Sequence, residues 1–222
     1  MIARKLVTDT IPPLKTSDSV QIGLDRMIEF RVSHLPIVND QQFLGLITSD
    51  DLIEAVDRTL QVGSLSLSLS FHQSFVHEWQ HVYDSIRLLD EQKLSVVPVV
   101  DKNNNYLGVI SVYAMMRYVS VVTASKEPGA ILVLGISNRD NSMTHIAQII
   151  ESDNVQILSS YVESFPDSTK LEITLKLNRV EVSTVVASLI RHNYTIRGVF
   201  NDSKSNEGAM DRYDQLMNYL DI

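Results

Sequence analysis

The fold is decided by residues 32–48, which read VSHLPIVNDQQFLGLIT, and by a near-copy at residues 94–111, LSVVPVVDKNNNYLGVIS. In each copy an apolar run with a proline is followed by a polar turn and by a second apolar run with a glycine. Turns rich in Asn and Asp between short apolar runs favour a hairpin, because these residues tolerate left-handed backbone. The repeat predicts two copies of one structural unit that pack together, since one unit alone buries too little apolar surface.

The segments on either side of each hairpin repeat as well. They are predicted to be helices, and Ser17 or Asp18 is the expected N-cap of the first one. The apolar stripes are Val20, Leu24, Met27 and Ile28, then Leu52, Ile53, Val56 and Leu60 in the first copy, and Val82, Ile86 and Leu89, then Met115, Met116 and Val119 in the second. Each unit is therefore predicted to run strand, helix, strand, strand, helix.

The most specific stretch is residues 45–52, GLITSDDL, with the pattern glycine, two apolar residues, Thr, two variable residues and Asp. Together with the proline-containing strand and the second copy, it resembles the cystathionine-β-synthase (CBS) domain. The tandem resembles a CBS pair, or Bateman module, with repeats at residues 1–62 and 63–123. The resemblance implies that an adenosine-containing ligand, such as AMP, ADP, ATP or S-adenosylmethionine, binds in the cleft between the repeats, with no required cofactor.

The resemblance also implies roles for individual residues. The Thr48 hydroxyl would contact a phosphate at the N-terminus of a helix, where backbone N–H groups favour an anion, and the Asp51 carboxylate would accept from the ribose hydroxyls. Adenine would lie beside residues 10–12 and the backbone of residues 34–35. The implied nucleotide-binding residues are Thr10, Ile11, Pro12, His34, Leu35, Pro36, Thr48, Asp51, Val97, Pro98 and Ser111.

Two alternatives stay open at this site. Thr48 and Asp51 also fit a capping box that the helix itself requires, with no ligand. In the second copy Ala114 stands where the ribose-binding Asp is expected, so that half-site is either empty or holds only a phosphate through Ser111. Arg117 or Lys93 would assist there, although both also fit a solvated helix surface.

Residues 77–81, HEWQH, match the H-E-x-x-H zinc-protease motif. That chemistry requires both histidines on one face of a helix and a third protein ligand, for which His72, Glu91 and Asp101 are nearby. Alignment with the first copy places HEWQH in the loop before a helix, so we expect no catalytic zinc. Adventitious binding of a transition metal by His72, His77 and His81 is the remaining metal hypothesis, because imidazole suits zinc, nickel and copper.

Residues 129–200 are predicted to run strand, helix, strand, strand, helix, strand, the ferredoxin-like βαββαβ order. This half resembles an ACT domain, which implies amino-acid binding at a dimer interface, or dimerisation through the sheets alone. Asp140 matches the family's loop before the first helix, but Ser142 replaces its glycine. Residues 64–70 alternate Ser and Leu and are interpreted as a connector, and residues 201–222 as a polar linker and a terminal helix.

The composition has an ordinary globular balance, with 44% hydrophobic residues, no cysteine and a formal net charge of −8 in 222 residues. The predicted elements of the two halves together make the expected fold class α/β (α+β). The acidic surface argues against nucleic-acid binding, and the absence of a long apolar run argues against a membrane span. The combined pattern resembles stand-alone bacterial regulators that join a CBS pair to an ACT domain. It implies a cytoplasmic, non-catalytic, homodimeric nucleotide sensor; the alternatives are a structural interaction module with an empty cleft and, remotely, a zinc hydrolase.

Overall fold

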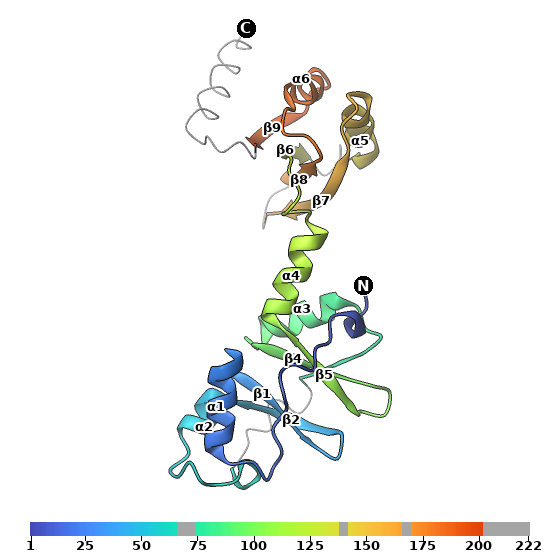
Figure 1. Cartoon of the computed structure of the whole chain (residues 1–222). Coiled ribbons are helices and arrows are strands. Elements are labelled where there is room, and N and C mark those ends of the chain that lie inside the picture. The colour runs from blue at the N-terminus through green and yellow to red at the C-terminus, as the bar shows by residue number, and fades with distance from the viewer. Residues whose placement is uncertain (66–73, 138–141, 166–169, 202–222) are drawn as a thin grey trace. The chain divides into compact units, whose positions relative to one another are not determined.

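A computed structural model of the chain separates into two compact units, Met1–Tyr118 and Val119–Ile222, which are treated one at a time below (Figure 1). The structure describes residues 1–65, 74–137, 142–165 and 170–201. Several predicted features lie outside these residues: most of the Ser-Leu connector, His72, Asp140, the turn after Phe165, and nearly all of the polar linker and terminal helix. In the described part, no helix has both the length and the apolar composition needed to cross a membrane.

The first unit contains the two predicted repeats. The first repeat comprises α1 (Val20–Phe30), β1 (His34–Asn39), β2 (Gln42–Thr48) and α2 (Ser49–Ile53). The second comprises β3 (Val76–His77), α3 (Val82–Glu91), β4 (Val96–Val100), β5 (Tyr106–Ser111) and α4 (Val112–Val122), and α4 continues past the boundary between the units. A short 3-10 helix precedes each set of elements: η1 (Ala3–Lys5) precedes the first repeat and η2 (Val62–Ser64) precedes the second.

The repeats match residue by residue in their pairing. β1 and β2 form an antiparallel hairpin, as do β4 and β5. β3 joins β4 in parallel, with Val76 opposite Val99, and the first repeat has an equivalent parallel bridge between Leu14 and Ile37. One apolar core contains residues of both repeats. Successive side chains of a strand point to opposite faces of the sheet, so one face of each hairpin directs Leu, Ile and Val side chains into this core.

The segment at the start of the chain pairs with the second repeat, not with the first. The Ala3 N–H donates to the carbonyl oxygen of Gln80 (2.8 Å), directly before α3. The corresponding place beside the first repeat is taken by η2, where the Val62 N–H donates to the carbonyl oxygen of Asp18 (2.8 Å), just before α1. Each repeat is thus completed by the segment that precedes the other one in the chain. η1 precedes the first repeat and pairs with the second, whereas η2 precedes the second repeat and pairs with the first.

The first helix begins later than predicted, and its apolar stripe is narrower. Ser19 caps α1, because its side chain accepts a backbone N–H of the first turn, whereas Ser17 and Asp18 were the predicted caps. Asp18 is instead engaged by the Arg26 guanidinium at 3.1 Å. Ile28, predicted to face the core, is 77% exposed.

The predicted helix after β2 is much shorter than its stripe. Only Leu52 of that stripe is buried; the exposed members are Ile53, Val56 and Leu60. Glu54 is the C-cap of α2, and a local turn follows in which the Asp57 carboxylate accepts both the backbone N–H (2.8 Å) and the hydroxyl of Thr59 (2.7 Å). Side-chain bonds of this kind compete with helical backbone bonds.

The second unit contains the six elements predicted between residues 129 and 200. They are β6 (Ile131–Ser137), α5 (Met143–Ser152), β7 (Ile157–Ser164), β8 (Lys170–Leu177), α6 (Ser183–Arg191) and β9 (Thr195–Phe200). All the strand pairs are antiparallel, in the order β7-β8-β6-β9. The buried faces of α5 and α6 pack on alternate residues of β6 and β8, which gives this unit its own core.

Candidate functional site

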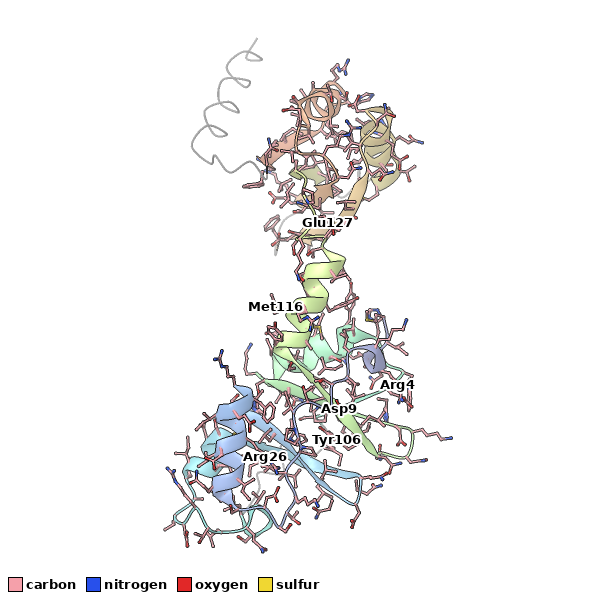
Figure 2. All side chains as sticks on the ribbon, in the orientation of Figure 1. Arg4, Asp9, Arg26, Tyr106, Met116 and Glu127 are labelled. Atoms are coloured by element: carbon pink, nitrogen blue, oxygen red, sulfur yellow. The ribbon has the colours of Figure 1, made fainter. Side chains whose placement is uncertain are left out.

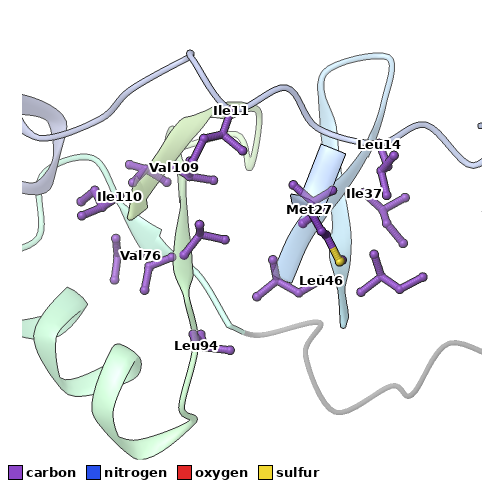
Figure 3. Close-up of a cluster of buried hydrophobic side chains, with 14 of the residues drawn as sticks. Ile11, Leu14, Met27, Ile37, Leu46, Val76, Leu94, Val109 and Ile110 are labelled. Atoms are coloured by element: carbon purple, nitrogen blue, oxygen red, sulfur yellow. The ribbon is translucent and has the colours of Figure 1, made fainter. Parts of the chain in front are cut away.

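The two repeats of the first unit are bridged by residues 8–14. At one end Thr8 pairs with Val109 of β5, and at the other end Leu14 pairs with Ile37 of β1. Ile11, between them, is buried in the shared core, and Figure 3 shows the segment passing from one sheet to the other. Thr10, Ile11 and Pro12 therefore lie at the boundary between the repeats, where the sequence placed the adenine.

A polar cluster occupies the same boundary where the repeats meet. The Ser95 hydroxyl accepts the backbone N–H groups of Ser33 and His34, both at 3.0 Å. The Nδ1 atom of His34 lies 3.2 Å from the Ser95 hydroxyl and accepts the Ser95 backbone N–H at 3.3 Å. Because Nδ1 accepts a backbone donor, the neutral ring carries its proton on Nε2.

The residue His34 is buried, with 8% of its surface exposed. Burial lowers the pKa of His34 from its ordinary value of 6.5, while the nearby carboxylates of Asp50 and Asp51 oppose that shift. His34 is also opposite Thr48 in the β1–β2 hairpin. The structure therefore brings His34, Thr48 and Asp51 together, while their role in nucleotide binding stays a prediction, in which only the backbone of His34 took part.

Thr48 and Asp51 form a reciprocal capping box at the start of α2. The Asp51 N–H donates to the Thr48 hydroxyl at 3.0 Å, while Oδ2 of Asp51 accepts the Thr48 N–H at 2.9 Å and the Thr48 hydroxyl at 2.8 Å. One carboxylate oxygen and the hydroxyl are thus both engaged by the cap. Both side chains are only partly buried.

The remaining predicted residues contribute differently. Leu35 and Val97 are fully buried core residues, and Pro36 and Pro98 are buried in β1 and β4, so these four side chains serve packing. Ser111 caps α4 by accepting the Ala114 N–H at 3.1 Å, and no carboxylate accompanies it.

Lys93 and Arg117 were the basic residues expected to help Ser111 hold a phosphate in the second half-site. Among the residues that the structure describes, no hydrogen bond joins either of them to Ser111. The Lys93 ammonium is highly exposed and pairs with Asp90 of its own segment at 2.9 Å. Lys93 therefore fits the alternative in which it belongs to a solvated surface and not to a phosphate site.

The HEWQH segment does not have zinc-protease geometry. His77 ends β3, and His81 is the N-cap of α3, so the two histidines are not on one helical face. The Glu78 carboxylate pairs with Arg4, a side chain labelled in Figure 2. His77 stacks on Trp79 (ring centroids 4.4 Å apart), and no group of three or more metal-ligating side chains occurs in the part of the chain that the structure describes.

Sequence reasoning missed the residues that join the two repeats. Ser33 and Ser95 occupy equivalent places just before the proline-containing strands, and this match was the available signal. The turns of the two hairpins also meet, because the Gln42 side chain donates to the Asn105 side chain at 2.8 Å. Polar residues at matched positions in a repeat are expected to face each other when the repeats pack about a twofold axis.

Comparison with known proteins agrees with this architecture. Among curated proteins, the chain is 24% identical over 137 residues to inosine-5'-monophosphate dehydrogenase of Bacillus subtilis and 25% identical over 112 residues to homoserine O-acetyltransferase of Methanocorpusculum labreanum. These matches take in 60% and 50% of this chain but only 28% and 23% of the relatives, so the chain spans about a quarter of their length.

Two solved structures are similar over about half of the chain. A CBS domain pair/ACT domain protein of Thermotoga maritima is 25% identical, covers 54% of this chain and 96% of its own, and gives a TM-score of 0.48. CBSX2 of Arabidopsis thaliana, solved in complex with AMP, is 24% identical, with 53% and 95% coverage and a TM-score of 0.45. The sequence model of the CBS domain matches residues 3–58 and 80–121, which therefore form a tandem pair of CBS domains.

Proposed function

We propose that the protein is a non-catalytic regulatory sensor whose CBS pair binds an adenosine-containing nucleotide beside Thr48 and Asp51. CBS pairs are in general regulatory modules and not catalytic ones. The observation that supports the proposal most directly is the state of the Asp51 carboxylate. Its Oδ2 atom is held in the capping box, and Oδ1 has no hydrogen-bond partner among the residues described.

A carboxylate held in this way suits a ribose. The 2'- and 3'-hydroxyls are donors, and a charged acceptor makes shorter and stronger hydrogen bonds than a neutral one. Because the capping box fixes the Asp51 side chain before any ligand arrives, little conformational entropy is lost on binding. The cap and the ligand role are therefore compatible, since each uses a different carboxylate oxygen.

The same geometry argues for a ribose at Asp51 and against a phosphate at Thr48. The Thr48 hydroxyl already donates to Asp51 and so has no proton left for a phosphate. Asp50 and Asp51 also place negative charge in the first turn of α2. AMP, ADP, ATP and S-adenosylmethionine share the adenosine group, so each remains a candidate ligand.

The C-terminal unit would receive the signal. α4 starts directly after its capping residue Ser111 and continues past the boundary between the units, so one helix belongs to both units. The strand order of the second unit supports a ferredoxin-like fold of the ACT type, and by resemblance an amino acid or a second copy of the chain is its expected partner. This combination is similar to that of the acetoin-utilisation regulatory proteins, which would place the protein in the cytoplasm as a homodimer.

Thermal unfolding of the full chain with AMP, ADP, ATP, S-adenosylmethionine, cyclic dinucleotides and amino acids tests the proposal. A ligand present at about 100 times its Kd stabilises the folded state by about 2.7 kcal/mol. We expect at least one adenosine compound to raise the melting temperature. Asp51→Asn should weaken its binding about 10- to 100-fold, because the amide oxygen can keep the cap while a donor replaces the free carboxylate oxygen.

Asp50→Asn is the matched control, because it removes the same charge from the neighbouring residue without touching the cap. Ala114→Asp is the converse variant and should strengthen binding to the second repeat, where the carboxylate is missing. Equal effects of Asp50→Asn and Asp51→Asn would assign the contribution to general charge and reject a ribose contact. If no adenosine compound stabilises the chain, the structural interaction module becomes the better description.

A further inference from the structure

The second unit contains a pair of histidines that the sequence analysis did not single out. His145 lies in the first turn of α5, and His192 caps the C-terminus of α6. Their ring centroids are 5.4 Å apart, with an angle of 76° between the planes. Both side chains belong to exposed residues, so solvent and ions reach them.

Each ring is held through its Nδ1 atom. The His192 Nδ1 lies 2.8 Å from the carbonyl oxygen of Ser188, which can only accept, so this nitrogen carries the proton and donates. The Nδ1 atom of His145 lies 2.8 Å from the Tyr194 hydroxyl. Neither Nε2 atom has a hydrogen-bond partner among the described residues.

His192 has the arrangement that metal-ligating histidines show, and the Tyr194 hydroxyl can accept from the Nδ1 atom of His145 in the same way. Such a histidine usually donates one ring N–H to a carbonyl or carboxylate, which fixes the ring and leaves the other nitrogen to bind the ion. With metal–nitrogen bonds of about 2.0–2.1 Å and a roughly tetrahedral angle, the centroids of two imidazoles on one ion lie about 5 Å apart. The observed separation of 5.4 Å is close to this value, and rotation of the two exposed rings out of their near-perpendicular contact would bring both Nε2 atoms to one ion.

We propose that His145 and His192 form a binding site for one divalent transition-metal ion, with water in the other coordination positions. Imidazole nitrogens favour zinc, nickel and copper over magnesium or calcium. The described residues include no third metal-ligating side chain in reach, so the site is a two-histidine clip between α5 and α6. Binding there would link the two helices and stabilise the second unit by mass action.

The site is independent of the nucleotide proposal, because it lies in the other unit and uses none of the CBS residues. Zinc titration of the full chain by calorimetry, in buffer without chelators, tests it with ZnCl2 alone as the probe. We expect one site, and a loss of at least 10-fold in affinity for His145→Ala and for His192→Ala. The double variant should lose no more than either single variant, since both rings are needed for one ion.

His77→Ala/His81→Ala is the matched control, because it removes two histidines that contact other groups in the first unit. Circular dichroism of each variant without zinc verifies that it folds. Tyr194→Phe adds a milder change, since it removes the hydroxyl beside His145 and should weaken binding less than loss of the ring. Unchanged zinc affinity in His145→Ala or His192→Ala, loss confined to the control variant, or no binding up to millimolar zinc would each overturn the proposal.

Discussion

At the scale of single residues, His34 shows how one side chain can contribute to both structure and site. Its ring and backbone join the first repeat to Ser95 of the second, and its neighbours on α2 are Asp50 and Asp51. The ring accepts a backbone N–H at Nδ1, so the neutral form is the one that fits this boundary. Protonation would replace that acceptor by a donor and place a charge in a buried position.

Acid should therefore weaken the first unit through His34. Its pKa is lowered on folding, so below the ordinary value of 6.5 the unfolded chain binds more protons than the folded one. The stabilisation is fully present above 6.5 and is lost as the pH falls toward the lower pKa of the folded state. We expect the melting temperature of the wild type to fall more steeply than that of His34→Gln between pH 7.5 and pH 5.

The His34→Gln variant should be less stable than the wild type at pH 7.5, by about 1 kcal/mol, because the Gln amide lies further along its side chain and places no acceptor where Nδ1 accepts the Ser95 N–H. The difference between the two proteins should shrink as the pH falls, since only the wild type loses this stabilisation. A difference that stays constant or grows across the range would show that His34 does not carry the pH dependence.

At the scale of elements, the pairing of the first segment with β5 depends on one glycine. Gly108 has a φ of +137°, which residues with a side chain rarely adopt. A Cβ atom built there would lie 2.6 Å from the carbonyl oxygen of Thr8. The Thr8 backbone and the Val7 side chain approach β5 so closely because Gly108 has no side chain.

Gly108→Ala should destabilise the first unit by about 1–3 kcal/mol, the cost of a strained backbone conformation, with the steric contact adding to it. Chemical denaturation followed by circular dichroism measures the change. Gly198→Ala in the second unit is the control, because a Cβ there meets the exposed Phe200 ring, which can move aside. Equal and small effects of the two substitutions would contradict the close approach at Gly108.

At the scale of the whole molecule, the residues that the structure describes form two separate apolar cores. One core is shared by the two CBS repeats, and the other lies between the four-stranded sheet and its two helices. Residues of the repeats contribute to the first core from both copies, so each repeat needs the other. The unit of folding is therefore expected to be the CBS pair and not the single repeat.

Calorimetry of the full chain should show two transitions, because the two cores are buried independently. An adenosine ligand should raise the transition of the first unit, and zinc should raise that of the second. Each ligand acts by mass action on the unit that it binds. A single transition that both ligands shift together would show that the two units unfold as one.

The sequence by itself determined the repeat, the two hairpins, the CBS motif at Thr48 and Asp51, and the order of elements in the second unit. These features follow from periodicity and turn chemistry, which act over neighbouring residues. Only the tertiary structure decided that the first segment completes the second repeat, that the Ser95 hydroxyl accepts the His34 backbone N–H, and that His145 lies beside His192. Such contacts join residues far apart in the chain, and they are selected by burial and by the pairing of buried polar groups, which no local pattern encodes.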